Sequence, residues 1–484
     1  MTTIKLDPGA ALLLDALHGA GHAAYAVGGC VRDSLLGLDP HDWDLCTSAR
    51  PEQVMALFGE EKCIPTGLQH GTVTVKQGGR LYETTTFRTE GAYSDGRHPD
   101  AVCFVPDVRE DLARRDFTIN AMAYSAEEGL IDPFGGRDDL AAHLVRAVGE
   151  PERRFEEDAL RILRLYRFAA RFGFAIDPAT GAAARALGPH LDCVSAERIQ
   201  EELLKLLAAP RPGSYLEPAV LAVILPELET EKQPERFAEL CRTIDRIEPT
   251  VENVPARLAA LLCPLGEAGA RKALRKLKCS NALTDEVTAL EREAGGGAGS
   301  FLLGHEFELR HPADALCLER HSHPAGRCPN SNSLFPPQAA VVAVAGHSIA
   351  RPIACGNRVP PQRTVLGETP GTPNTTLTVQ AKRLLGRYEL PTIQRLTALC
   401  SARHPEQAVA FAALRAEAER LTAENACCRV SQLAVNGRDL MAAGVAPGPG
   451  LRRALEALLE EVITGRLPNE KAELLAFAAK FSAS

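Results

Sequence analysis

The pattern of hydrophobic and polar residues changes character near Gly149. Before that point, a leucine-rich helical pattern over 10–25 precedes a short apolar strand, AYAV (24–27), a Gly-Gly pair and a second helical segment, VRDSLLG (31–37). DWDLCT (42–47) predicts a strand, and GTVTVKQGGRLYETTTF (71–87) predicts a β-hairpin that turns at Gly78-Gly79. The N-terminal part is therefore predicted to be mixed α and β.

Beyond Gly149 the hydrophobic residues recur at helical spacing. FEEDALRILRLYRFAARF (155–172) is strongly amphipathic and is predicted to be one helix, and AERIQEELLKLL (196–207) follows the same pattern. Helical patterns continue to about Leu290, then resume at AKRLLGRY (381–388) and run to the end of the chain. The predicted fold class is an α+β head followed by all-α regions.

The stretch 321–380 follows neither period. It holds nine prolines, four arginines and no lysine, and its only acid is Glu368. Two interpretations stay open, a disordered insertion or a segment mistranslated through a frameshift or an unspliced stretch. The spacing of Cys317, His321, His323 and Cys328 matches no standard zinc pattern.

Length and composition set outer bounds. A chain of 484 residues predicts two to four compact units, and 45% hydrophobic with 24% charged residues is typical of a globular protein. We expect a cytoplasmic protein with reduced cysteines and no membrane contact, because no apolar run approaches a membrane span and no export signal opens the chain. The net charge of −8 argues against a surface that is basic throughout, but allows a local basic groove. No protein partner is predicted.

The stretch VGGCVRDSLLGLDPHDWDLCTSAR (27–50) carries the first candidate chemistry. Gly28 and Gly29 would let the backbone approach a phosphate closely. Asp42 and Asp44, two residues apart in a strand, would present their carboxylates on one face, where Mg²⁺ relieves their repulsion. Glu83, in YETTTF, is the candidate third acid of a two-metal site, unless it is an ordinary exposed strand glutamate.

Seven ordered motifs carry a resemblance to a known family: VGGCVRDSLLG, DWDLCTSA, ETTTFR, DGRHPD, RRDFTINAMAY, DPFGGRDDL and FEEDALRILRLYRFAARFGF. They resemble the class II tRNA nucleotidyltransferases, which include CCA-adding enzymes and have bacterial poly(A) polymerases as close relatives. The resemblance covers 20–210 and returns at 433–475. It implies a polymerase-β-like nucleotidyltransferase head and a helical neck, body and tail. The expected boundaries are head 1–148, neck 149–210, body 211–310 and 381–430, atypical insertion 311–380 and tail 431–484.

The resemblance also implies residue roles. Gly29 and Arg32 match positions that touch the nucleotide phosphates, and Asp42 and Asp44 match the metal ligands. The other implied nucleotide-binding residues are Arg115, Asp116, Asn120, Asp158, Arg161, Arg164 and Arg167. Arg114 either serves the same site or flanks it.

The implied base readers make chemical sense. Asp158 and Arg161, three apart on a predicted helix, offer an acceptor beside a donor. Cytosine and adenine both present an amine beside a ring-nitrogen acceptor, whereas uracil and guanine reverse that order and would leave mismatched polar groups. The alternative is a plain helical ion pair between Asp158 and Arg161.

The predicted function is template-independent addition of C, C and A to the 3′ end of tRNA from CTP and ATP, with release of pyrophosphate and two Mg²⁺ ions. The polar segment 88–100 resembles the loop that family members use to switch from C to A, unless it is an ordinary surface loop. In the tail, Arg452 and Arg453 follow a Gly-Pro-rich turn and suit RNA backbone contact, unless this region is only a packing unit.

Three other functions compete with this prediction. A poly(A) polymerase or A-adding enzyme shares nearly all of the motifs. An inactive RNA-binding homologue is the second alternative, and it requires that the stretch 321–380 disrupts the body. An HD-type phosphohydrolase would use His41-Asp42, but this pair lies in a strand pattern without further helical ligands.

Overall fold

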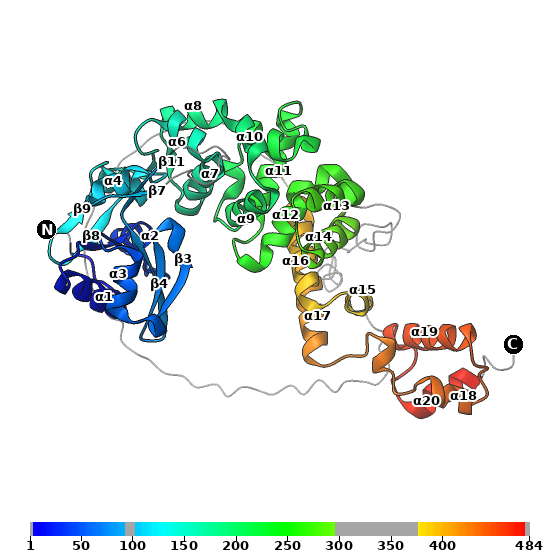
Figure 1. Cartoon of the computed structure of the whole chain (residues 1–484). Helices are drawn as coiled ribbons and strands as arrows, with labels where there is room; N and C mark the ends of the chain where they lie inside the picture. Colours follow the sequence, from blue (N-terminus) through cyan, green and yellow to red (C-terminus); the bar gives the residue numbers. More distant parts are fainter. Residues whose placement is uncertain (1–2, 92–101, 296–375, 480–484) are drawn as a thin grey trace, which may run out of the picture.

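The computed structural model describes residues 3–91, 102–295 and 376–479. Its elements follow one another along an arc, from a sheet-containing head through helical regions to a small helical tail (Figure 1). No helix in these ranges is both long enough and apolar enough to cross a membrane. The predicted α+β head followed by all-α regions is confirmed.

The head is built on a mixed sheet in the order β3-β4-β5-β2-β1-β8-β9. Its strands are β1 (Ala24–Val27), β2 (Leu45–Thr47), β3 (Cys63–Gly67), β4 (Thr72–Gln77), β5 (Arg80–Thr86), β8 (Ala123–Ser125) and β9 (Gly129–Ile131). All neighbours are antiparallel except β2 and β5, which run parallel. A separate pair consists of β6 (Arg88–Glu90) and β7 (Val102–Phe104). The head helices are α1 (Pro8–Gly19), α2 (Gly29–Leu35), α3 (Pro51–Phe58), α4 (Val108–Ala113) and α5 (Gly136–Ala141).

Local sequence explains where several head elements begin and turn. Asp7 caps α1 by accepting hydrogen bonds from the backbone N–H of Gly9 and Ala10. The predicted hairpin is confirmed as β4 and β5, and its turn residues Gly78 and Gly79 both have positive φ, at 57° and 80°. Glycine adopts such angles without a steric penalty, which is why this pair marks a tight hairpin turn.

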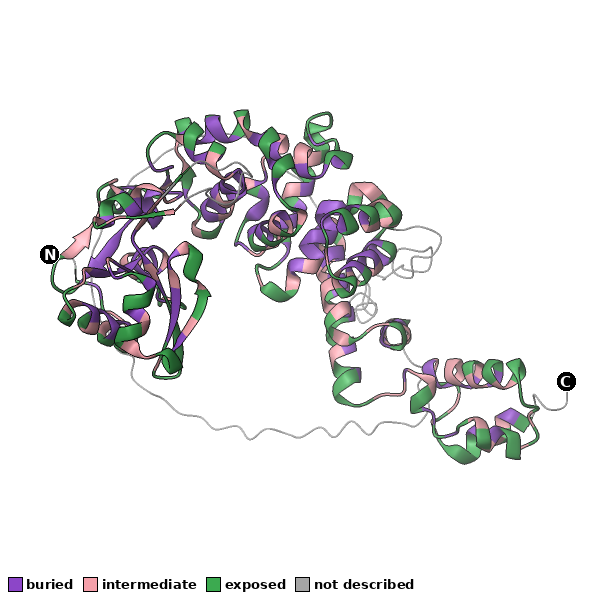
Figure 2. Cartoon of the chain, viewed as in Figure 1, coloured by how far each residue is buried: buried purple, intermediate pink, exposed green. Residues whose placement is uncertain are grey.

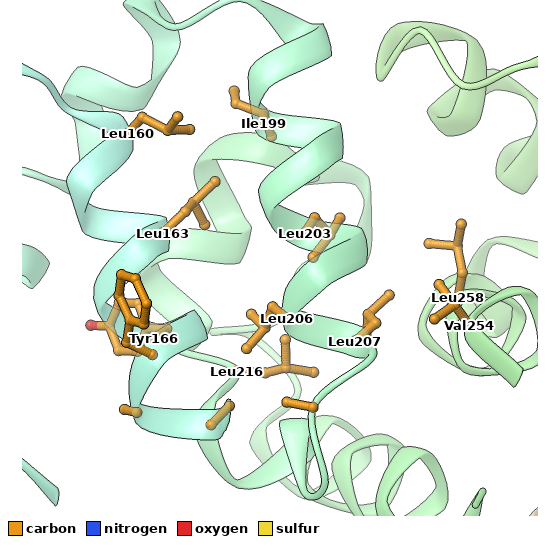
Figure 3. Close-up of a cluster of buried hydrophobic side chains, with 14 of the residues drawn as sticks. Leu160, Leu163, Tyr166, Ile199, Leu203, Leu206, Leu207, Leu216, Val254 and Leu258 are labelled. Atoms are coloured by element: carbon orange, nitrogen blue, oxygen red, sulfur yellow. The ribbon is translucent and has the colours of Figure 1, made fainter. Parts of the chain in front are cut away.

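The neck joins the head through a short parallel pair, β10 (Leu144–Val145) with β11 (Ala175–Ile176). Its helices are α6 (Pro151–Glu157), α7 (Leu160–Phe172), α8 (Pro178–Ala186) and α9 (Ala196–Leu207). Helix α9 coincides with the predicted segment 196–207. Leucines and isoleucine of α9 face Leu160 and Leu163 of α7 across a buried apolar layer (Figure 3).

The remaining helices form the body and tail. Those of the body are α10 (Pro218–Ile224), α11 (Pro234–Arg246), α12 (Val254–Leu262), α13 (Gly266–Lys276), α14 (Asn281–Ala294), α15 (Thr376–Arg387), α16 (Leu390–Arg403) and α17 (Ala408–Ala423). Those of the tail are α18 (Gly437–Ala442), α19 (Pro449–Ile463) and α20 (Lys471–Ala478). Buried residues line the interior of each region (Figure 2). The main hydrophobic cluster runs from the head into the body, whereas the tail, from Leu433 onward, packs around its own cluster.

Most of the atypical stretch 311–380 lies outside the described residues, as do Cys317, His321, His323 and Cys328. Residues 376–380 are an exception, because they form the first turns of α15. The predicted non-periodic segment therefore extends a few residues too far. Of the segment 88–100, which is predicted to resemble the switching loop, the described residues include only the beginning, with β6, because 92–101 lie outside the described ranges. Its role in switching from C to A stays a prediction.

Candidate active site

Asp42 and Asp44 lie on the approach to β2. Both side chains are exposed, whereas Trp43 between them is buried, and this alternation places the two carboxylates on the same side of the chain. The predicted strand 42–47 is wrong at its start, because β2 begins at Leu45. The two aspartates thus precede β2, although the carbonyl of Asp44 already accepts from the N–H of Val27 in β1 at 3.0 Å.

Glu83 lies beside Asp44 because β2 and β5 are parallel neighbours. Leu45 pairs with Thr84, so one residue earlier Asp44 comes opposite Glu83. Loss of hydration, the Glu83 carboxylate and, more weakly, Asp42 raise the pKa of Asp44 to about 6, against the opposing effect of Arg115. Although the Asp44 side chain reaches solvent, the protein around it limits its hydration. Such crowded oxygens are the donor set that a hard divalent cation neutralises.

The described residues contain no group of three or more His, Cys, Asp and Glu side chains arranged to hold a metal ion. Asp42 and Asp44 can therefore supply two ligands to a metal ion, and oxygens of the nucleotide or of water would have to supply the others. The role of Glu83 as a third acid stays a prediction. The same finding removes support for an HD-type centre at His41-Asp42 within the described ranges.

Gly28 brings the backbone against an arginine. It has φ 78° and ψ −121°, and its N–H donates to the carbonyl of Met122 at 3.1 Å. A Cβ atom at this position would lie 2.8 Å from Nη1 of Arg115. The backbone angle therefore favours glycine here, and a larger residue would also displace the guanidinium of Arg115. At the next position, a Cβ atom on Gly29 would lie 3.6 Å from Nη2 of Arg32.

Arg32 is buried on α2 beneath this turn. Its Nε donates to Asp33 at 2.8 Å, and its Nη1 donates to Oδ1 of Asn120 at 2.5 Å. Burial lowers the pKa of Arg32, and the adjacent Asp33 carboxylate opposes that effect. The guanidinium is thus fixed by its neighbours before any ligand arrives.

Arg114 and Arg115 share one buried carboxylate. Asp111 accepts from Nη2 of Arg114 at 2.9 Å and lies 3.4 Å from Nη2 of Arg115. The shorter distance shows that Arg114 is bound by Asp111, a residue of the head. Arg115 extends over Gly28, and its buried Nε has no hydrogen-bond partner among the described residues. Arg115 is thus the better placed of the two for a ligand.

Asp116 joins the head to the neck. Arg164 of α7 donates to Oδ2 of Asp116 from Nη2 at 2.6 Å and from Nε at 2.9 Å, and Asn120 donates to Oδ1 at 3.0 Å. Burial alone would raise the pKa of Asp116, but the Arg164 charge and these hydrogen bonds outweigh it and lower the pKa. The predicted residues Asp116, Asn120, Arg32 and Arg164 are therefore brought into one connected network.

The predicted single helix over 155–172 is wrong. It breaks at Asp158, which has extended angles (φ −148°, ψ 102°), and α7 starts at Leu160. Oδ1 of Asp158 accepts from the N–H of Leu160 at 3.1 Å, a local bond of the kind with which aspartate competes against a continuous helix.

Asp158 and Arg161 do not form the plain helical ion pair that was the alternative interpretation. Oδ2 of Asp158 accepts from Nη2 of Arg198 at 2.8 Å. Arg161 donates instead to Glu157 at 2.7 Å and to the carbonyl of Arg114 at 3.0 Å. Arg161 thus contacts the head, whereas Asp158 is held within the neck, and the base-reading role of the pair stays a prediction.

Helix α9 contributes residues that the sequence motifs did not single out. Arg198 holds Asp158, and Oε2 of Glu202, four residues later, lies 2.6 Å from Nε of Arg167. Glu202 is buried, with Oε1 3.8 Å from Arg164. A signal existed, since opposite charges four apart share one helix face, next to the apolar stripe that packs on α7.

Arg452 and Arg453 lie on α19 in the tail, far from the head (Figure 1). Both are exposed, and Nε of Arg452 contacts Glu456 at 2.8 Å. The structure therefore leaves both open interpretations of this region, RNA contact and simple packing, untested.

Comparison with known proteins decides the family. Residues 24–146 match the poly A polymerase head domain, 173–231 match a probable RNA- and SrmB-binding site of polymerase A, and 385–478 match a putative tRNA nucleotidyltransferase domain 2. A CCA-adding enzyme of Limosilactobacillus fermentum is 33% identical over 473 residues, which cover 97% of this chain and 95% of that enzyme. The chain belongs to the family of CCA-adding enzymes.

Other CCA-adding enzymes agree. That of Lactobacillus helveticus is 43% identical over 280 residues, covering 57% of this chain and 68% of that enzyme. A crystal structure of the CCA-adding enzyme of Bacillus stearothermophilus in complex with CTP superposes with a TM-score of 0.70 at 30% identity, covering 99% of this chain and 98% of the other. The predicted family, and with it nucleotidyltransferase activity, is confirmed.

Proposed function

We propose that this protein adds C, C and A to the 3′ end of tRNA in the cytoplasm, using CTP and ATP and no nucleic-acid template. The observation that carries the proposal is the placement of Asp42, Asp44 and Arg115 beside the Gly28 turn, in a chain related over nearly its whole length to CCA-adding enzymes. The Bacillus stearothermophilus relative binds CTP, and the CCA-adding enzyme of Thermotoga maritima has been solved in complex with tRNA.

In the proposed reaction, the terminal hydroxyl of the RNA attacks the α-phosphate of the nucleotide, and pyrophosphate leaves. Asp42 and Asp44 would hold Mg²⁺, which when bound lowers the pKa of an attacking hydroxyl and offsets triphosphate charge. Arg115 and Arg32 add positive charge next to the glycine turn, where the triphosphate would lie.

We assign base selection to Asp158 and Arg161 at the start of the neck. Asp158 accepts and Arg161 donates, which matches the Watson–Crick edges of cytosine and adenine and opposes those of uracil and guanine. Arg198 already holds one oxygen of Asp158, which supports a fixed acceptor rather than a freely rotating one. Arg164 and Arg167 would line the same pocket.

The test is incorporation of labelled nucleotides into tRNA that lacks CCA, with CTP and ATP offered separately and together. We expect two C residues and one A, loss of all addition in Asp42→Ala, and altered base selection or activity in Arg161→Ala. Asp39→Ala is the matched control, because Asp39 is an exposed acid of the same segment.

Each rival gives a distinct result. Unlimited addition of A without use of CTP would identify a poly(A) polymerase. tRNA binding without any addition would identify an inactive RNA-binding homologue. Normal turnover in Asp42→Ala would contradict the assignment of Asp42 as a metal ligand. Measuring whether Mg²⁺ or Mn²⁺ binds to the nucleotide-free variant tests the same assignment without an activity readout.

A further inference from the structure

Three arginines surround the ring of Phe168 on α7. The guanidinium carbon lies 4.1 Å from the ring centroid for Arg167 and 5.3 Å for both Arg32 and Arg164. Phe168 is buried, with 4% of its surface exposed. All three distances are within the range in which a cation is attracted to an aromatic ring.

The arginines come from two parts of the molecule. Arg164 and Arg167 belong to α7, whereas Arg32 belongs to α2 of the head. Phe172, one helical turn further along α7, lies nearly parallel to Phe168, with an interplanar angle of 3° and 6.2 Å between centroids. It also lies 4.9 Å from the guanidinium carbon of Arg32. The head arginine therefore lies against both rings of a neck helix.

Carboxylates near this cluster balance the charge of the three guanidiniums and hydrogen-bond to the edges of two of them. Asp33 hydrogen-bonds to Arg32 and Asp116 to Arg164, whereas Glu202 forms an ion pair with Arg167, at 2.6 Å from its Nε, without hydrogen-bond geometry. Hydrogen bonds of this kind lie in the plane of a guanidinium, whereas an aromatic face attracts the cation through its negative quadrupole. The two contacts are complementary, and together they fix three like charges that would otherwise repel one another.

We propose that Phe168 is a positioning residue for nucleotide binding, with its ring as a shared surface that orients Arg32, Arg164 and Arg167. This inference rests on the proposed function, which places those arginines at the nucleotide. The ring itself touches no reacting atom. Its effect is on the affinity for CTP and ATP, through the arginines.

The electronic character of the ring can be changed almost without changing its size. Phenylalanine at 168 is replaced by its 4-fluoro, 3,5-difluoro and pentafluoro analogues, which progressively weaken the negative face of the ring. Phe174 is the matched control, because it is equally buried and its ring contacts are with Phe172 and His143, at 5.5 and 5.0 Å. The Kd for CTP and for ATP is measured on the full chain, together with the melting temperature.

We expect Kd to rise stepwise with fluorination at 168, by about tenfold in total, and to stay constant at 174. A flat series at 168, or equal slopes at both positions, overturns the inference. If the pentafluoro protein does not fold, the first two steps still give the slope. Arg164→Ala separates the two proposals: normal CTP binding in that variant contradicts the nucleotide site itself, whereas weak binding with a flat fluorine series contradicts only the role of Phe168.

Discussion

Arg164 of the neck donates two hydrogen bonds to Asp116 of the head, at 2.6 and 2.9 Å. The same carboxylate accepts from Asn120, which in turn accepts from Arg32. The side chains expected to bind the phosphates and the base are thereby connected through one acid. Changes at Asp116 should consequently affect both stability and nucleotide binding.

Asp116→Asn removes the charge that compensates Arg164. We expect it to lower the free energy of unfolding by about 2–3 kcal/mol at pH 7, below the range for a fully buried pair because Arg164 is partly exposed. The folded pKa of Asp116 lies below the unfolded value of about 3.9, so its contribution is complete above that value and is lost as pH falls through the folded pKa. Denaturant titrations should show a constant difference from pH 8 to about pH 5 that shrinks below about pH 4. A difference that grows in acid would contradict the ion pair.

Gly28→Ala tests the close approach of Arg115 to the backbone. Alanine at this position meets both a positive φ and an arginine nitrogen, whereas Gly37→Ala meets a similar φ, 73°, in open space. Gly37→Ala should lose roughly 1–2 kcal/mol of stability from the positive φ, and Gly28→Ala should lose more, because its ψ of −121° lies outside the left-handed helical region. Only Gly28→Ala should raise KM for CTP and ATP. Equal KM values in the two variants would show that Arg115 does not depend on this turn.

Asp44→Asn should stabilise the metal-free protein while abolishing activity. The folded pKa of about 6 exceeds the unfolded value, so ionised Asp44 destabilises the fold above about pH 6, and this effect disappears below about pH 4, where both states hold the proton. In EDTA at pH 7 the melting temperature should rise relative to wild type, with Asp39→Asn unchanged. Added Mg²⁺ should raise the melting temperature of the wild type more than that of Asp44→Asn. A lower melting temperature for Asp44→Asn in EDTA would mean that the carboxylate is satisfied without metal.

Arg198→Ala frees the Asp158 carboxylate. We expect the ratio of kcat/KM for CTP over UTP to fall by about tenfold, because a mobile acceptor no longer discriminates between an amine and a carbonyl. Lys205→Ala on the same helix breaks only an exposed pair with Glu201 and is the control. Partial recovery in Arg198→Lys would support positioning through charge. An unchanged ratio in Arg198→Ala would assign Arg198 to stability alone.

Replacing Arg452 and Arg453 together by alanine tests the tail. Both are exposed, so the melting temperature should barely change. If they contact the RNA backbone, tRNA affinity should fall, and its dependence on salt should become shallower by up to about two units of slope. Filter binding between 50 and 200 mM salt, with the Kd for CTP as the control, measures both effects. An unaltered slope would leave this region a packing unit.

Local patterns predicted the elements whose causes are local. The hairpin followed from alternating residues and the Gly78-Gly79 pair, and α9 followed from its apolar spacing. The predicted strand over Asp42 begins too early, because alternation alone does not show where strand pairing begins. The break at Asp158 cannot be predicted for a similar reason, since the apolar period passes unchanged through a single extended residue.

The candidate site was predictable as a set of residues but not as a set of contacts. Motif resemblance supplied Asp116, Arg164 and Arg32, yet nothing in the sequence says that Asp116 pairs with an arginine 48 positions away. The role of Glu202 does not follow from the sequence because its arginine partners lie on α7, and that of Phe168 does not because one of its three arginines, Arg32, comes from α2. Arginine and phenylalanine recur on one face of RLYRFAARF (164–172). This recurrence indicates a helix face on which cationic side chains lie beside aromatic rings.

The contacts between α2 and α7 limit how this protein can be recombined with its relatives. Arg32 rests on Phe168 and Phe172, and Asp33 bonds to Arg171, so each half of the binding surface is completed by the other. A chimera that takes its sheet from one parent and α7 from another would separate matched side chains within one site. The smallest exchangeable unit for engineering new nucleotide preferences is thus the whole segment from α1 to α9, moved as one block.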